Sequence, residues 1–225
     1  MSMNLPRCPT CPSKDYCPIP TDGPLDAETI VFGERPGQQE EWRARKAVEK
    51  GYFNARGANC FVGDAGEEFN GSYLSLAHLE RRGIRVGNTV LCGADGNKHP
   101  TDKQAFECAQ FHIAEDIRAT KRLKLVVLMG GVACSLLSAV TDFDLETEHG
   151  IPRRVENWFG YSGWVVGVYH PAAALHQTSY MIPLLADWEA LGRWLASGMQ
   201  EWQWPRDQFE EHDFRLARMP HEVVR

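Results

Sequence analysis

Residues 123–131, with the sequence Leu-Lys-Leu-Val-Val-Leu-Met-Gly-Gly, decide the fold. Their apolar run does not alternate with polar residues, which is typical of a strand buried on both faces of a parallel sheet. Gly130-Gly131 ends this strand, and a helix is predicted to follow it over residues 132–140. Three more strands are predicted at 29–32, 86–92 and 164–169. Because strands that alternate with helices form a sheet covered on both faces, we predict a three-layer α/β/α fold with a short central four-stranded parallel sheet.

Amphipathic patterns predict further helices beside these strands. They cover residues 39–50, 74–83, 102–120 and 182–195, with Asp102 as the N-cap of the third. An arm rich in Cys and Pro precedes the first strand, at residues 1–27. We expect residues 1–198 to form a single domain that includes this arm, and residues 199–225 to form a C-terminal tail. The tail contains Trp202 and Trp204 but has no pattern that predicts a structure.

The composition is that of a globular protein, with 43% apolar and 24% charged residues in a chain of 225. No apolar run approaches the roughly 20 residues of a membrane span, and the first residues lack the apolar core of a secretory signal. We therefore expect a cytoplasmic protein that acts as a monomer, with no membrane partner. The net charge of −6 argues only weakly against DNA as a partner, since DNA binding needs no more than a local basic face. Three basic clusters are candidates, although each alone is typical of a solvated surface: Arg81, Arg82 and Arg85; Arg118, Lys121, Arg122 and Lys124; and Arg153 and Arg154.

The chain has seven cysteines, an odd number that argues for free thiols or a metal site rather than disulfides. Cys8 and Cys11 have the two-residue spacing of a metal-binding pair. Cys92 ends a predicted strand, and Cys108 lies 16 residues later in the next predicted helix, so that both can return to one place. A zinc site, an iron–sulfur site and a pair of buried thiols are all compatible with this pattern.

Ligands of parallel α/β sheets bind beyond the carboxyl ends of the strands. This rule brings Glu34, Cys92, Gly130 and His170 together at one rim of the predicted sheet. Short motifs lie at this rim and in the loops beside it: Gly33-Glu34-Arg35-Pro36-Gly37, Phe61-Val62-Gly63-Asp64-Ala65-Gly66, Asn88-Thr89-Val90-Leu91-Cys92, and Tyr169-His170-Pro171-Ala172. Together with Asn97, Lys98, Pro100 and the spacing of Cys92 and Cys108, they resemble, in order, the motifs of the family-4 (iron–sulfur) uracil-DNA glycosylases. The resemblance covers most of the chain, from Cys8 to His176.

The resemblance implies a uracil-DNA glycosylase-like fold. It also implies an enzyme of DNA repair that hydrolyses the N-glycosidic bond of uracil, or of a related pyrimidine, in DNA. A [4Fe–4S] cluster, with zinc as the alternative, would be held by four thiolates: Cys8, Cys11, Cys92 and Cys108. Cys17, Cys60 and Cys134 would then be ordinary thiols.

The resemblance also assigns roles to the residues that meet the base, which such enzymes extrude from the DNA stack. Phe61 would stack on the base, and the side-chain amide of Asn88 would bind O4 and N3–H of uracil. His170 would donate a hydrogen bond to O2 of the departing base, and Glu34 would orient or deprotonate the attacking water. Without the resemblance these would be ordinary residues: a core aromatic, a strand-end amide, a half-buried histidine and a turn carboxylate.

Arg35 departs from the family, which has a small Ala or Gly at this position of the first motif. A long cation at the wall of the site predicts a base-binding role for Arg35 toward a negatively charged group that uracil lacks. The other departures are a longer link over residues 38–60, Gly93-Ala94 for Arg-Pro, and His149 and His176 for arginines. The open alternatives are therefore a group-transfer enzyme that modifies a phosphate-bearing thymine or uracil derivative in DNA, a non-catalytic iron–sulfur DNA-binding protein, and a zinc protein unrelated to DNA.

Overall fold

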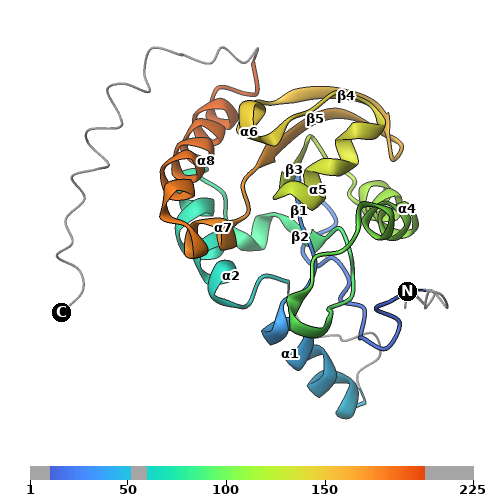
Figure 1. Cartoon of the computed structure of the whole chain (residues 1–225). Coiled ribbons are helices and arrows are strands. Elements are labelled where there is room, and N and C mark those ends of the chain that lie inside the picture. The colour runs from blue at the N-terminus through green and yellow to red at the C-terminus, as the bar shows by residue number, and fades with distance from the viewer. Residues whose placement is uncertain (1–10, 52–59, 201–225) are drawn as a thin grey trace, which may run out of the picture.

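The computed structural model describes residues 11–51 and 60–200, which form three layers with a sheet between two sets of helices (Figure 1). Within these residues the sheet has five strands in the order β2-β1-β3-β5-β4. They are β1 (Thr29–Gly33), β2 (Arg85–Asn88), β3 (Leu125–Met129), β4 (Arg153–Trp158) and β5 (Tyr161–Val168). β1, β2, β3 and β5 are parallel, and β4 is antiparallel to β5. The predicted α/β/α fold class is confirmed, with one strand more than the sequence indicated.

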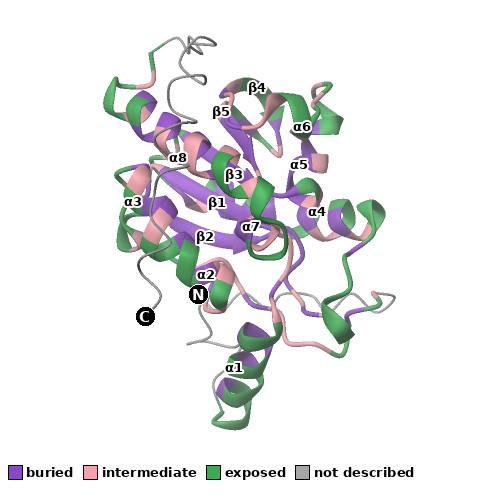
Figure 2. Ribbon diagram, turned by 60° about the vertical axis from the view of Figure 1, so that its left-hand side comes forward, coloured by how far each residue is buried: buried purple, intermediate pink, exposed green. Residues whose placement is uncertain are grey.

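A hydrophobic core on each face of the sheet explains why every residue of β1 and β3 is buried (Figure 2). Side chains alternate along a strand, so that Val31 and Val127 belong to one core and Ile30 and Val126 to the other. The helices that supply the opposite walls are α8 (Met181–Ala196) for the first core, and α4 (Asp102–Ala119) and α5 (Gly131–Ser135) for the second. The middle strands thus hold the rim residues on a rigid support.

β4 is the strand that the sequence did not predict. Its sequence, Arg-Arg-Val-Glu-Asn-Trp, contains only two inward-facing residues, Val155 and Trp158, and the others are at least partly exposed. The register with β5 shifts between these two residues, which interrupts the alternation of apolar and polar positions. A strand at the edge of a sheet needs little apolar surface, and so it gives a weak signal in the sequence.

The predicted helices 39–50, 102–120, 132–140 and 182–195 agree with the structure in position, but the helix predicted at 74–83 does not. Of the predicted helix 74–83 the structure has only α3 (Leu74–Leu76) and a 3-10 turn (Arg81–Gly83). The helical segment begins earlier than predicted, with α2 (Asp64–Glu68) and a π-helical turn (Phe69–Tyr73). The others are α1 (Gln38–Glu49), a 3-10 turn (Asp95–Asn97), a 3-10 turn (Leu136–Ala139) that extends α5, α6 (Leu145–Glu148), α7 (Pro171–His176) and a 3-10 turn (Thr178–Tyr180). Thr101, not Asp102, caps α4: its side chain accepts a hydrogen bond from the N–H of Gln104 at 3.2 Å. Asp102 is the first helical residue, where a carboxylate also suits the helix dipole.

No helix in the described part of the chain is long and apolar enough to cross a membrane. The boundary predicted at residue 198 stays a prediction, because all but Met199 and Gln200 of the predicted tail lie outside the described residues.

Candidate active site

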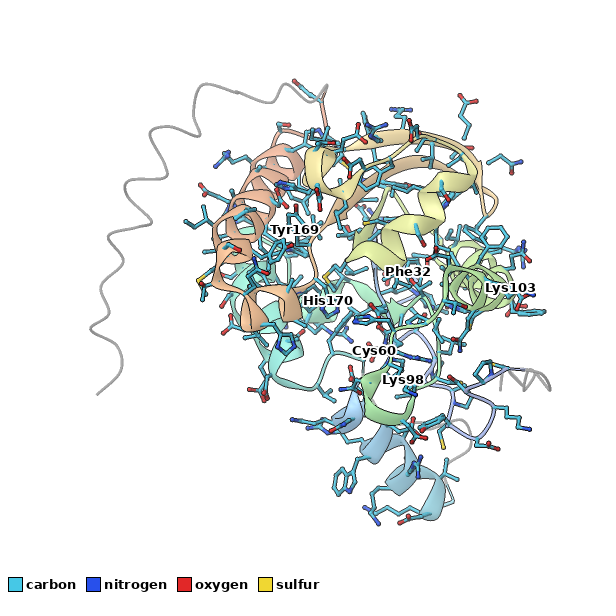
Figure 3. All side chains as sticks on the ribbon, in the orientation of Figure 1. Phe32, Cys60, Lys98, Lys103, Tyr169 and His170 are labelled. Atoms are coloured by element: carbon cyan, nitrogen blue, oxygen red, sulfur yellow. The ribbon has the colours of Figure 1, made fainter. Side chains whose placement is uncertain are left out.

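Predicted site residues stand at the carboxyl ends of three of the parallel strands. Glu34 follows β1, Asn88 is the last residue of β2, and His170 follows β5 by two residues. Gly33 is in register with Asn88 on the neighbouring strand. Figure 3 shows His170 where β5 passes into α7, near the loop that carries Lys98. The structure therefore brings these residues to one rim of the sheet, where α/β folds bind ligands.

Two glycines allow the site residues to approach the backbone. A Cβ on Gly33 would lie 2.7 Å from the ring of Phe61 and 2.9 Å from Oδ1 of Asn88. A Cβ on Gly130, which follows β3 with φ of 88°, would lie 3.0 Å from Cβ of His170. The ring centroids of Phe61 and His170 are 6.3 Å apart. The three predicted side chains thus gather around one point of the rim.

Phe61 is held in an unusual backbone conformation, with φ of 56°. Its N–H donates to Oε1 of the buried Glu40 at 2.7 Å, and its carbonyl accepts from Nδ2 of Asn70 at 3.0 Å. The ring is buried and packs on Phe69, with centroids 5.1 Å apart. A non-glycine residue with positive φ costs roughly 1–3 kcal/mol and persists only where its surroundings impose it. These contacts therefore fix the direction of the Phe61 ring.

The amide of Asn88 is the most informative feature of the site. Asn88 is only 1% exposed, yet neither Oδ1 nor Nδ2 has a hydrogen-bond partner among the described residues. A buried polar group without a partner costs roughly 1–3 kcal/mol. An amide that is kept in this state is suited to a ligand that offers one donor and one acceptor side by side.

His170 is a neutral donor. Its Nδ1 accepts a hydrogen bond from the N–H of Ala172 at 3.2 Å, which makes His170 the N-cap of α7. Burial of the ring, with a smaller contribution from the charge of His99, lowers the pKa of His170 to about 4. At neutral pH the ring therefore carries one proton, and the bond to Ala172 leaves that proton on Nε2.

Glu34 is joined by a histidine that the sequence did not single out. The Nδ1 atom of His99 lies 2.8 Å from Oε1 and 3.0 Å from Oε2 of Glu34. The Glu34 backbone is fixed as well, since its carbonyl accepts from the N–H of Val90 at 2.9 Å. His99 lies between Lys98 and Pro100, which the sequence motif did include, but no pattern in this loop indicates which side chain turns toward Glu34.

The side chain of Arg35 contacts groups other than the residues that gather around Gly33, and its base-binding role stays a prediction. Its guanidinium donates hydrogen bonds to the carbonyls of Cys92 (3.1 and 3.2 Å), Gly93 (3.2 Å) and Lys98, and to the hydroxyl of Ser13 (2.8 Å). A planar guanidinium with several fixed donors suits such a cluster of carbonyls. The side chain therefore ties the N-terminal segment to the loop after Cys92.

Replacing Arg35 with alanine should lower the free energy of unfolding by about 2–3 kcal/mol, because several carbonyls would lose a charged donor. Arg35→Lys should recover little of this loss, since one ammonium group cannot reach all of these acceptors. Urea unfolding would measure both changes, with Arg43→Ala on the exposed side of α1 as the control. Equal stability of the Arg35→Ala and Arg43→Ala variants would contradict the tethering role.

Three of the predicted ligand cysteines, Cys11, Cys92 and Cys108, lie in the part of the structure that Arg35 connects: the N-terminal segment, the loop after β2 and α4. Nε2 of Gln104 lies 3.6 Å from Sγ of Cys11, and Cys108 is one turn further along α4. Hydrogen bonds from His112 and from the N–H of Leu91 lower the pKa of the Cys108 thiol, although burial opposes them. Cys8 lies outside the described residues, within which no three His, Cys, Asp or Glu side chains are close enough to hold a metal ion. The all-thiol donor set fits an iron–sulfur cluster or zinc by its chemistry.

A buried charged network supports the strand end that carries Asn88. Nε2 of His112 is 3.0 Å from the carbonyl of Thr89, and Nδ1 is 3.3 Å from Oδ2 of Asp116. Arg85 pairs with the other oxygen of Asp116 at 2.9 Å. Although burial opposes it, hydrogen bonds to Asp116 and Cys108 raise the pKa of His112 to about 9. The helix α4 is thus attached to β2 through charge-assisted hydrogen bonds.

Most residues of the basic clusters that were candidates for a DNA-binding face form ion pairs with carboxylates of the same chain. Arg85 is 4% exposed in its ion pair, and Arg122 and Lys124 both pair with Glu28. Arg153 pairs with Glu148. These clusters alone therefore do not define a basic surface at the rim.

Comparison with known proteins identifies relatives over most of the chain. The family model of the uracil DNA glycosylase superfamily matches residues 20–192. The Type-4 uracil-DNA glycosylase of Archaeoglobus fulgidus is 24% identical over 177 residues, which is 77% of this chain and 80% of that protein. The Type-4 uracil-DNA glycosylase of Pyrobaculum aerophilum is 25% identical over 187 residues, covering 77% and 82% of the two chains.

Proposed function

Because the chain belongs to the uracil-DNA glycosylase superfamily, we propose that it hydrolyses the N-glycosidic bond of uracil, or of a closely related pyrimidine, in DNA. The observation that carries this proposal is the buried, unpartnered amide of Asn88 beside Phe61 and His170. Uracil offers the matching pair of groups, an acceptor at O4 and a donor at N3–H. Binding the base would satisfy an amide that has no partner among the described residues.

The chemistry assigned to the site has three parts. Phe61 covers the face of an extruded base, and Asn88 binds its edge. Water attacks C1′ of the sugar while the glycosidic bond breaks and its electron pair leaves with the base. Nε2–H of His170 donates to O2 as negative charge builds there, and Glu34 takes the proton of the water. The lowered pKa of His170 supports this role, since a neutral ring can stabilise the departing anion without losing its own proton.

We also propose that Cys8, Cys11, Cys92 and Cys108 hold a [4Fe–4S] cluster, with zinc as the alternative. The support is the position of Cys11, Cys92 and Cys108 around the Arg35 tether, together with their all-thiol chemistry. Bound there, the cluster would act as a structural cross-link between the N-terminal arm, the loop after β2 and α4.

A group-transfer reaction on a phosphate-bearing base receives no support from Arg35. That alternative depended on a free guanidinium at the wall of the site, and the carbonyls of Cys92, Gly93 and Lys98 engage it instead. Hydrolysis is therefore the function that the geometry favours.

The proposed function is tested with oligonucleotides that contain a single uracil, thymine or 5-substituted pyrimidine, in single-stranded and duplex form. Base loss leaves an abasic site that alkali cleaves, so that product appears as a shorter strand on a denaturing gel. We expect the wild-type protein to cleave the uracil strand and to leave the thymine strand intact. No alkali-labile product from any of these strands would refute hydrolysis.

Asn88→Ala should separate base choice from stability. Loss of the edge contact should reduce the preference for uracil over cytosine, whose edge carries an amino donor and a ring acceptor instead, by roughly tenfold or more, the equivalent of one lost hydrogen bond. The melting temperature should not fall, because the change removes a buried amide that has no partner in the described structure. Rates of base release from matched uracil and cytosine strands measure the base preference, and thermal unfolding of the wild type and of Asn88→Ala measures the stability. A marked fall in melting temperature would indicate that the amide has a structural partner instead.

A further inference from the structure

His99 forms an exposed contact with a largely buried carboxylate. Its side chain is 84% exposed, whereas that of Glu34 is 20% exposed. Nδ1 of His99 is within hydrogen-bond distance of both carboxylate oxygens, at 2.8 and 3.0 Å. An exposed imidazole contributes little to the core, and an exposed ion pair contributes little to stability. The contact therefore calls for a role other than holding the fold together.

His99 and Glu34 lie at the same rim of the sheet as His170, because Glu34 follows β1 and His170 follows β5. Burial lowers the pKa of His170, and the charge of His99 adds to this effect. Among the described residues, the titratable and charged groups near His99 are the carboxylate of Glu34 from the end of β1, the neutral ring of His170 from the end of β5, and Lys98 in its own loop. Arg35 holds the carbonyl of Lys98 and so anchors this loop.

We propose that His99 is a positioning residue of the reaction, whose Nδ1–H fixes the Glu34 carboxylate in the direction of the attacking water. This inference rests on the proposed function. The oxygen of the water bonds to C1′, the C1′–N1 bond breaks with its electron pair going to the base, and the water proton passes to Glu34. His99 keeps its own proton throughout. A carboxylate whose two oxygens share one N–H donor cannot rotate freely, so its remaining lone pairs keep fixed directions and restrict where the water can bind.

The test compares the single-turnover rate of uracil release in four variants. His99→Ala should be about ten- to a hundredfold slower, the value of a hydrogen bond to a charged group. His99→Asn should keep most of the rate, because its amide N–H can occupy the place of Nδ1–H. In a Glu34→Gln background, His99→Ala should cause no further loss, as expected of two residues that act as one unit. The affinity for uracil DNA and the melting temperature should be unchanged by either substitution of His99.

The control is His78→Asn, which replaces another exposed histidine beside the amino ends of β1 and β3. Asparagine is chosen because His78 has φ of 55°, which asparagine tolerates. Long-range ¹H–¹⁵N NMR gives a readout that does not depend on activity: His99 should carry its proton on Nδ1 in the wild type and lose this preference in Glu34→Ala.

Three outcomes would overturn the role of His99: a full rate in His99→Ala, the same loss in His99→Asn as in His99→Ala, or a loss that multiplies with that of Glu34→Gln. A wild-type protein that releases uracil while His99→Ala is unaffected would leave the proposed function standing without this residue. A wild-type protein that releases no base would overturn the proposed function, and this role with it.

Discussion

Replacing His170 with alanine should slow base release by about 10²–10³-fold, because the site would lose the donor that we propose for O2 of the departing base. The loss should appear in the rate of the chemical step and not in DNA affinity, since charge develops on O2 only as the glycosidic bond breaks. The donor is ready before the substrate binds: the pKa of about 4 keeps the ring neutral, and the bond from Ala172 keeps its proton on Nε2. Single-turnover rates on a uracil strand measure this effect.

A second variant separates this role from the structural role of the same side chain. His170 is also the N-cap of α7, and removing a cap costs about 1 kcal/mol. His170→Asn should keep the cap, because an asparagine oxygen can accept from the N–H of Ala172, but its shorter side chain cannot reach O2. Both variants should lose the rate, and only His170→Ala should lose stability. A rate in His170→Asn close to that of the wild type would assign His170 to the helix alone.

If the four cysteines hold a cluster as we propose, replacing Cys92 or Cys108 with alanine should remove that metal and most of the soluble protein. Structural metal sites contribute on the order of 10 kcal/mol to folding, which is comparable to the whole stability of an ordinary domain. Cys8→Ala should have the same effect and would test the ligand that lies outside the described residues. Iron and sulfide analysis and the visible absorption spectrum measure the loss, and a zinc content without visible absorption would favour the alternative metal.

Cys134→Ala is the matched control for this prediction. Cys134 is buried like a core residue, and burial raises its pKa to about 12, so that its thiol stays protonated. Its removal should leave the metal content and the absorption spectrum of the wild type. If the Cys92 and Cys108 variants kept their metal as well as Cys134→Ala does, the four-thiolate site would be wrong.

The strands that the sequence predicted are those buried over most of their length. β1 and β3 are apolar at almost every position, because helices cover both sides of the middle of the sheet, and this continuous pattern marks where each strand ends. The sequence did not predict β4 because this edge strand buries only two of its six residues and so lacks a continuous apolar pattern. The α4 cap was displaced by one residue because Thr101 and Asp102 are both good capping residues by type, and only the backbone conformation distinguishes them.

The site was predictable where it depends on strands and unpredictable where it depends on loops. Asn88 ends β2 in register with Gly33, so that its position follows from strand pairing. Arg35 and His99 follow no such rule, because their side chains turn toward partners that are distant in sequence. The sequence shows a cation in the first motif. The carbonyls of Cys92, Gly93 and Lys98 that bind it are more than 50 residues away along the chain, and only the folded loop places them beside Arg35.

The two outer strands of the sheet, β2 and β4, have edges that could pair with strands of other molecules and cause aggregation. On one side, the outer edge of β2 is partly occupied, because the N–H of Asp22 donates to the carbonyl of Val86 and the carbonyl of Asp22 accepts from the N–H of Val86. On the other side, β4 presents Arg154 and Glu156, both exposed, along a strand whose pairing is interrupted by a register shift. Unpaired strand edges recruit strands from other molecules, and charged residues and irregular pairing suppress this. The polarity that concealed β4 in the sequence thus also protects the folded sheet against aggregation.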